Sequence, residues 1–330
     1  MATLSDASAS IGAVVIGRNE GDRLKHCLSS LASLKSVIYV DSGSTDGSPE
    51  WAAHKGVEVI RLDMNLPFTA ARARNSGFRR LQQVAPHLDY VQFVDGDCEV
   101  SKEWLPAAAS FLDTHREVGA VCGRRRERFP ERSIYNWLCD QEWDSPIGEA
   151  KACGGDVLIR KQVLAAVGGY RDDMIAGEEP ELCLRMRAAG WRVWRLDAEM
   201  TLHDAAMTQF RQWWRRILRS GYAFALGAHL HGSSPDRHWV WESRRAWIWG
   251  FWLPLCCLAA GLALGPWGWA TFLVYPLQLI RQARRNPGSL KQRVTLALFQ
   301  LLSRFPEAIG QLKFIRDRLL GQRSQIIEYR

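Results

Sequence analysis

Short apolar runs alternate with amphipathic stretches over the first 100 residues. Between the first two runs, residues 11–17 and 36–41, apolar residues recur at the spacing of a helix. Further helices are predicted over 49–54 and 68–84. Strands that alternate with helices in this way predict an α/β domain with a mostly parallel sheet flanked by helices. The runs with the length of buried strands are 11–17, 36–41, 57–62 and 90–95.

The second and fourth of these strands each end in an acidic residue, Asp41 and Asp95. Ligands of open α/β sheets bind beyond the carboxyl ends of the strands, so we expect both carboxylates at the binding edge. Later elements are predicted as strands at 118–122, 156–159 and 193–196 and a helix at 181–189.

The pattern changes beyond residue 206. Residues 210–228 mix tryptophan and other apolar residues with four arginines. This favours an amphipathic helix at a membrane interface; the alternative is a helix docked on the protein itself. Residues 290–320 are also amphipathic and basic, and suit the same surface.

Residues 246–280 contain no charged side chain. The sequence Gly-Pro-Trp-Gly at 265–268 divides them into segments of about 19 and 12–14 residues, whereas a membrane-crossing helix needs roughly 17–25. Arginines flank both ends, which favours a cytosolic position for both. We predict a transmembrane or re-entrant hairpin; the alternative is an apolar hairpin packed against protein or lying in the interface.

Charge divides the chain at the same point. Residues 1–206 carry a net charge of −5, and residues 207–330 a net charge of +13. Eleven of the 15 tryptophans follow residue 190 and lie beside arginines, which favours a membrane over nucleic acid as the anionic partner. We therefore predict a flexible N-terminus (1–10), a catalytic domain (11–206) and a basic, Trp-rich, membrane-associating helical region (207–330).

The composition of the 330-residue chain is that of a globular protein, with 47% hydrophobic and 24% charged residues. It excludes a disordered or collagen-like chain. The eight cysteines include no Cys-x-x-Cys pair, which indicates a reducing compartment and argues against a zinc finger. Residues 1–10 lack a basic start and an apolar core, so no signal peptide is expected.

The strongest candidate for cation binding is Asp95-Gly96-Asp97, which comes directly after an apolar strand. Two carboxylates separated by a glycine can converge on one cation, and Mg²⁺ or Mn²⁺ prefers oxygen ligands. Taken alone, the pattern also fits a solvated turn.

Three other groups are candidates, each with a structural alternative. The loop that starts at Asp41 is rich in hydroxyls and backbone donors, and fits either a nucleoside or phosphate site or a polar turn. Glu178 and Glu179 precede a helix, and fit either a general base or a favourable helix start. His203 fits a metal ligand or an ordinary buried histidine.

Taken in order, these motifs resemble glycosyltransferase family 2, whose members are inverting enzymes with a Rossmann-like GT-A fold. The resemblance covers about residues 11–205. It rests on the Asp41-Ser-Gly-Ser-Thr-Asp-Gly loop, Arg74-Asn75, the Asp-Gly-Asp at 95–97, the Gly-Gly-Tyr at 168–170, the Gly-Glu-Glu-Pro-Glu-Leu at 177–182 and His203.

The resemblance implies a role for each matching residue. Asp41 and Ser42 belong to the nucleoside-binding loop, Arg74 helps hold the nucleotide, and Asp95 faces the ribose or sugar. Asp97 binds the divalent cation, Mg²⁺ or Mn²⁺, with His203 as a further contact. Glu179 matches the catalytic Asp of the family, and Glu178 the residue before it.

Three positions depart from the family pattern. Ser42 stands where a second Asp is usual, Tyr170 replaces Phe, and Glu179 replaces Asp. The last change adds a methylene to the base, so the choice between Glu179 and Glu178 stays open.

The function implied is transfer of a sugar from a nucleotide-diphosphate sugar to an acceptor. Together with the C-terminal region, it suggests a lipid-linked glycan or polyprenyl phosphate acceptor on the cytoplasmic side of the plasma or inner membrane. The alternatives are a non-catalytic membrane scaffold with the same fold and a sugar-nucleotide nucleotidyltransferase. A Gly-rich, basic loop after the first strand would mark the latter, and residues 17–21 match it poorly.

Overall fold

The computed structural model describes residues 10–321. The predicted flexible N-terminus, residues 1–10, lies outside the described residues except for Ser10. The chain divides into two compact units, the first ending at Thr208 and the second beginning at Gln209. Each is described by itself.

A nine-stranded sheet forms the centre of the first unit, in the order β3-β2-β1-β4-β8-β6-β9-β5, with β7 paired to β9. Its strands are β1 (Ile11–Gly17), β2 (Val37–Asp41), β3 (Glu58–Arg61), β4 (Tyr90–Asp95), β5 (Cys98–Val100), β6 (Val118–Glu127), β7 (Gly148–Glu149), β8 (Val157–Arg160) and β9 (Arg192–His203).

The sheet is mixed rather than mostly parallel. The predicted parallel pairing holds for β1 with β2, β1 with β4 and β2 with β3, and also for β6 with β9. However, β8 runs antiparallel to β4 and β6, and β5 and β7 run antiparallel to β9. Only two residues separate β4 from β5, too few for a helix, so the simple alternation of strand and helix ends at Asp95.

The last strand is also longer than predicted. Apolar residues indicated a strand only at 193–196, but β9 continues to His203. Asp197 and Glu199 lie on its exposed side and interrupt the apolar pattern, and its register with β6 shifts at several points. His203 therefore ends a strand rather than following one.

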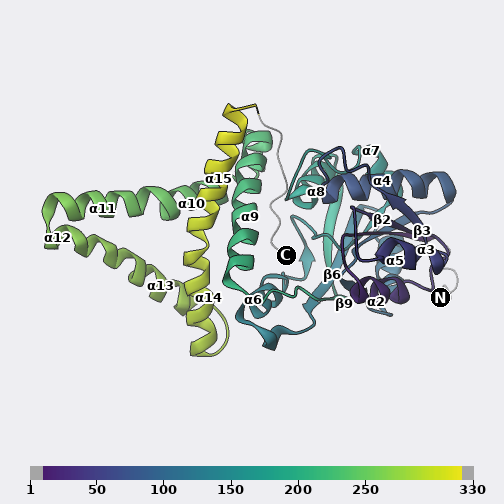
Figure 1. Cartoon of the computed structure of the whole chain (residues 1–330), viewed down its shortest axis with the longest axis horizontal. Helices are drawn as coiled ribbons and strands as arrows, with labels where there is room; N and C mark the ends of the chain where they lie inside the picture. The colour runs from purple at the N-terminus through teal and green to yellow at the C-terminus, as the bar shows by residue number, and fades with distance from the viewer. Residues whose placement is uncertain (1–9, 322–330) are drawn as a thin grey trace. The chain divides into compact units, whose positions relative to one another are not determined.

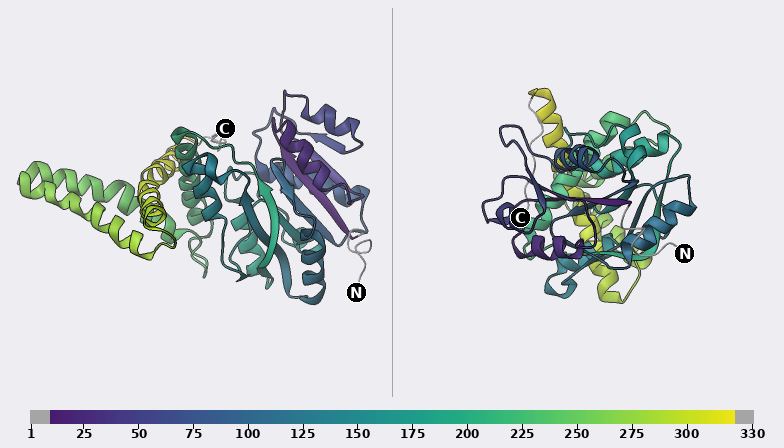
Figure 2. Two further views of the ribbon diagram at one scale, coloured as in Figure 1. Left: turned by 90° about the horizontal axis from the view of Figure 1, so that it is seen from below. Right: turned by 90° about the vertical axis from the view of Figure 1, so that its right-hand side faces the viewer.

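Helices cover both faces of the sheet, with α2 and α4 on opposite faces (Figures 1 and 2). The core between them holds buried residues such as Val14, Leu24 and Phe93. The helices are α2 (Asp22–Ser30), α3 (Ser48–His54), α4 (Ala70–Val84), α5 (Trp104–Thr114), α6 (Ile134–Glu142), α7 (Lys161–Ala166) and α8 (Glu178–Ala188).

The second unit is helical throughout its regular elements. These are α9 (Phe210–His231), α10 (Val240–Trp247), a π-helical turn (Ile248–Trp252), α11 (Leu253–Leu264), α12 (Pro266–Trp269), a 3₁₀ segment (Ala270–Leu273), α13 (Val274–Arg285), α14 (Leu290–Leu302) and α15 (Arg304–Leu319).

Helix α9 packs along α15 (Figure 1). A Cβ added at Gly221 would lie 2.1 Å from the Glu307 carbonyl oxygen, so glycine permits this close approach. Trp213 packs edge-on against Phe299, and Tyr222 against Phe314. Helix α9 therefore has the docked arrangement that we considered as the alternative to an interfacial helix.

Helices α11 and α13 form the two arms of a hairpin that are joined at α12 (Figure 1). Among the described residues, one continuous helix, Val240–Leu264, is long and apolar enough to cross a bilayer. The apolar side chains of this helix are largely exposed to solvent, and Leu262 is 75% exposed. Trp267, in α12 at the turn of the hairpin, is 86% exposed. Among the described residues of the second unit, little packs against this apolar surface.

Packing of α4 on the sheet provides a test of the core. A Cβ added at Gly77 would lie 2.3 Å from a methyl group of Val14. In an exposed helix, Gly→Ala gains about 1 kcal/mol, but the clash should reverse the sign here. We expect Gly77→Ala to destabilise the protein by about 1–3 kcal/mol in urea denaturation. Gly154→Ala, which meets no atom within 4 Å, should have little effect.

Candidate active site

Asp41 and Asp95 lie at the carboxyl ends of β2 and β4, the two strands on either side of β1. In the registers of β1, Gly17 lies beside Asp41 of β2, and Ile16 lies beside Asp95 of β4. Both acids are therefore at one edge of the sheet, as the sequence predicts.

The loop after Asp41 is held in place by that side chain. One carboxylate oxygen of Asp41 accepts hydrogen bonds from the backbone N–H groups of Gly43 and Ser44, both at 3.0 Å, and the other from the hydroxyl of Tyr39 at 3.1 Å. Asp41 and Ser42 are buried. The fold thus presents a rigid, polar loop where the nucleoside-binding role was predicted.

Arg74 lies at the centre of a second cluster. Its guanidinium is 2.9 Å from Asp95 Oδ1, 2.8 Å from Glu178 Oε1 and 3.1 Å from Glu179 Oε1, although Arg74 itself is only 2% exposed. A buried charge requires partners, and here three elements, α4, β4 and α8, supply one cation and three carboxylates. Sequence reasoning selected all four residues but not this arrangement.

Asp95 lies between two arginines, because Arg125 Nη2 is 3.3 Å from its other carboxylate oxygen. Burial alone would raise the pKa of Asp95, but Arg74 and Arg125 outweigh it and hold the pKa below its ordinary value. Asp95 is therefore ionised in the folded protein at neutral pH.

The two glutamates at the start of α8 differ in exposure. The side chain of Glu178 is 6% exposed and that of Glu179 is 19% exposed. Burial, and then the neighbouring Glu178, raise the pKa of Glu179 to about 7, and Arg74 opposes them. Such a carboxyl exchanges its proton near neutral pH. Glu181, in contrast, pairs with Arg185 one turn along the same helix.

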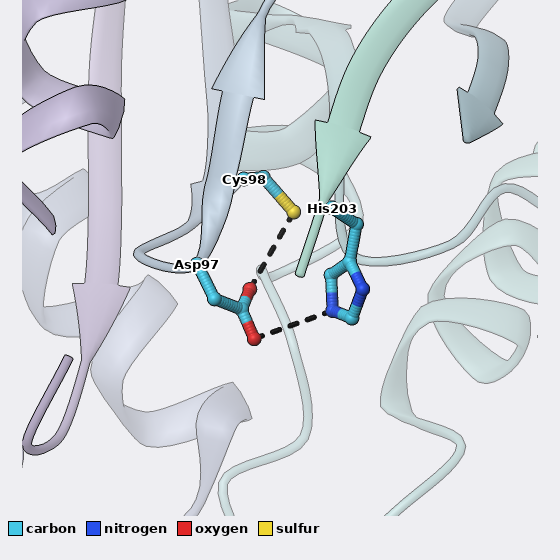
Figure 3. Close-up of side chains that lie close together, drawn as sticks. All are labelled: Asp97, Cys98 and His203. Atoms are coloured by element: carbon cyan, nitrogen blue, oxygen red, sulfur yellow. Dashed lines mark hydrogen bonds and ion pairs between the residues drawn. The ribbon is translucent and has the colours of Figure 1, made fainter. Parts of the chain in front are cut away.

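A third cluster joins Asp97 to His203 (Figure 3). His203 Nε2 lies 3.2 Å from Asp97 Oδ2, and His203 Nδ1 lies 3.4 Å from Glu127 Oε2. Asp97, Cys98 and His203 each offer a ligand atom, and these atoms lie within 4.8 Å of one another. This set of oxygen, sulfur and nitrogen donors fits a divalent cation.

Four residues of the site were not predicted: Cys98, Glu127, Arg125 and Asp156. Glu127 is buried and accepts hydrogen bonds from Asn136 and the N–H of Ala205, so that it faces His203 in a fixed orientation. The carboxylate of Asp156 accepts hydrogen bonds from the backbone N–H of Asp95 and from the hydroxyl of Thr201. These contacts depend on the register between β6, β8 and β9, which the sequence pattern did not reveal.

The family model for glycosyl transferase family 2 matches residues 13–150. This part of the chain therefore resembles a family 2 glycosyltransferase domain. The match covers the strands that end at Asp41 and Asp95 and the Asp97 position, and stops before α8 and β9.

Two curated proteins are similar in sequence to this chain. The pre-mycofactocin glycosyltransferase of Mycobacterium tuberculosis is 27% identical over 238 residues, which is 68% of this chain and 48% of that protein. The succinoglycan biosynthesis protein ExoA of Rhizobium meliloti is 26% identical over 173 residues, 49% of this chain and 51% of that protein. The chain thus spans about half the length of these curated relatives.

A solved structure shares the fold. The mannosyltransferase PcManGT from Pyrobaculum calidifontis, in complex with GDP-Man and Mn²⁺, superposes with a TM-score of 0.57 at 18% identity. The superposition covers 94% of this chain and 88% of that one. The predicted α/β fold of the GT-A type, followed by a helical region, is thereby confirmed.

The raised pKa of Glu179 predicts how stability depends on pH. Between the ordinary value of 4.5 and about 7, the folded protein holds a proton that the unfolded chain has lost, so stability falls as pH rises. A glutamine side chain at this position has no proton to lose. The stability of Glu179→Gln relative to that of the wild type should therefore rise over this window, by on the order of 3 kcal/mol. Urea denaturation at several pH values measures the difference, and the exposed Glu103→Gln serves as control.

Proposed function

We propose that the protein is an inverting glycosyltransferase that moves a sugar from a nucleotide-diphosphate sugar to an acceptor hydroxyl or phosphate. The observation that carries this proposal is the Arg74 cluster, which places a carboxyl with a pKa of about 7 beside the ligand-binding edge of a family 2 domain. A general base needs a pKa near the working pH, so that it is ionised yet still able to take a proton.

The donor is proposed to bind along the strand ends. Asp41 and Ser42 contact the nucleoside through the rigid loop, and Asp95 faces the ribose or sugar. Arg74 is buried and helps hold the nucleotide indirectly, by fixing Asp95. Asp97 and His203 hold a divalent cation, Mg²⁺ or Mn²⁺. When bound, such a cation stabilises the negative charge on the leaving diphosphate. The complex of PcManGT with GDP-Man and Mn²⁺ supports this donor class.

Glu179 is proposed as the base. Its carboxylate takes the proton of the acceptor oxygen as that oxygen attacks the anomeric carbon, and the bond to the nucleoside diphosphate breaks with its electron pair. One displacement inverts the configuration at that carbon. Glu179 is preferred over Glu178, because Glu178 is almost fully buried.

The acceptor is proposed to be a lipid-linked glycan or a polyprenyl phosphate. The uncovered apolar helix Val240–Leu264 and the arginines that flank the hairpin support association with the cytoplasmic face of the plasma or inner membrane. Because the two units are one chain, a second unit bound to lipid keeps the first within reach of lipid-linked molecules.

Donor turnover tests the enzymatic proposal. We expect the protein to release nucleoside diphosphate from one member of a panel of UDP-, GDP- and dTDP-sugars when Mn²⁺ or Mg²⁺ is present. Glu179→Gln should lower turnover about 10²–10⁴-fold and leave donor binding intact, because only proton transfer is lost. Asp97→Asn should abolish the metal dependence of donor binding, and Glu103→Gln should behave as wild type. A folded protein that binds no donor would favour the non-catalytic scaffold.

Vesicle flotation tests the membrane proposal. We expect Leu262→Glu to weaken binding to phosphatidylglycerol-containing vesicles roughly 100-fold, since a charge in the hydrocarbon region costs about 2.5–3.5 kcal/mol. Ile147→Glu is the matched control, because Ile147 is 59% exposed but lies in the first unit, outside the predicted membrane-associating region. Equal loss in both variants, or no binding by the wild type, would contradict insertion of the hairpin.

A further inference from the structure

Cys98 immediately follows Asp97 and has no role in the proposal above. It begins β5, which pairs with β9 in an antiparallel register that sets Cys98 directly opposite His203. Residues opposite each other on neighbouring strands extend their side chains from the same face of the sheet. The Cys98 sulfur and the His203 ring therefore converge because of the fold, and both flank the Asp97 carboxylate (Figure 3).

The distances allow one ion to contact all three side chains. Cys98 Sγ is 3.5 Å from Asp97 Oδ1, and the ligand atoms of the three residues lie within 4.8 Å of one another. Bonds from Zn²⁺ to sulfur and to nitrogen are about 2.3 and 2.0–2.1 Å long, so two ligands of one ion are separated by less than about 4.4 Å. The three atoms are thus spaced for one ion after small adjustments of the side chains.

The orientation of His203 supports a cation at this position. A carboxylate faces each ring nitrogen, Glu127 at Nδ1 and Asp97 at Nε2. A neutral imidazole has a single N–H and can satisfy only one of them. If Nδ1 donates to Glu127, a cation between Nε2 and Asp97 satisfies both remaining groups. Histidine ligands of metals are typically held by a carboxylate in this way.

Cys98 also lies close to Asp95 and Asp156, but that set is less suitable for a cation. Arg125 forms ion pairs with both carboxylates, and Arg74 forms another with Asp95. Two guanidinium groups already neutralise these acids, and their charge opposes a second cation.

We propose that Cys98 is a direct ligand of the divalent cation that we assign to Asp97 and His203, and that its sulfur gives this site a preference for Co²⁺ or Zn²⁺ over Mg²⁺. The inference rests on the proposed function. When the metal binds, the Cys98 S–H bond breaks, its proton passes to solvent and the sulfur electron pair forms the bond to the metal. Thiolate and imidazole ligands suit zinc-like ions, whereas Mg²⁺ prefers oxygen alone.

Cobalt provides a direct readout of the sulfur ligand. Titration of the full-length protein with Co²⁺ should produce a near-ultraviolet sulfur-to-cobalt charge-transfer band. Cys98→Ser should lose the band and bind Co²⁺ at least about tenfold more weakly, because even outer-shell ligand partners contribute 10–100-fold to metal affinity. Cys139→Ser removes an equally buried thiol outside this group and should keep both the band and the affinity.

The outcomes separate this inference from the proposed function. A wild type that binds Co²⁺ without the band, or a Cys98→Ser variant that keeps it, overturns Cys98 as a ligand and leaves the Asp97–His203 site standing. A wild type that binds neither Co²⁺ nor Mn²⁺ overturns the proposed cation site and this inference with it. Cys98→Ala is the second variant, and thermal unfolding confirms that each protein is folded. In active protein, Cys98→Ser should raise the ratio of kcat/KM with Mg²⁺ to that with Co²⁺.

Discussion

The site depends on one buried guanidinium. Arg74 is the cation that allows Asp95, Glu178 and Glu179 to come together away from water, and each belongs to a different part of the chain from Arg74. Removing one partner of a buried ion pair typically costs about 3–5 kcal/mol, because the remaining charge is left uncompensated. The contacts of Arg74 therefore fix the start of α8 against the end of β4, and so fix the distance between the proposed base and the strand ends.

The same cluster determines how the carboxyls ionise. Arg74 and Arg125 both act on Asp95 and keep it charged, whereas Glu179 shares Arg74 with two other acids and loses more from burial than it gains. One surplus carboxyl next to too little positive charge is the physical reason for a pKa of about 7. Acid–base roles in enzymes are assigned by such differences of environment rather than by residue type.

The acids could be predicted from the sequence because each follows a signal that is local. Asp41 and Asp95 end apolar runs, and Glu178 and Glu179 stand at a helix start. The Arg74-Asn75 motif singles out Arg74, but its place at the centre of three acids could not be predicted, because that depends on how the start of α8 approaches the end of β4. The contacts of His203 and Cys98 were missed for a related reason: they depend on the register of β5 and β9, two strands about 100 residues apart, and exposed acids in β9 obscured that strand.

Charge also explains why the second unit differs from the first. Two of its few acidic residues form ion pairs within the unit, Glu307 with Arg304 and Asp317 with Lys313 and Arg316. Its positive charge is therefore carried by exposed residues such as Arg284 and Arg285 at the end of the second hairpin arm. An apolar hairpin with a basic end offers the hydrophobic and the electrostatic interaction that the proposed attachment to an anionic bilayer would use. The first unit pairs its buried charges with one another, whereas the second unit leaves positive charge exposed on its surface.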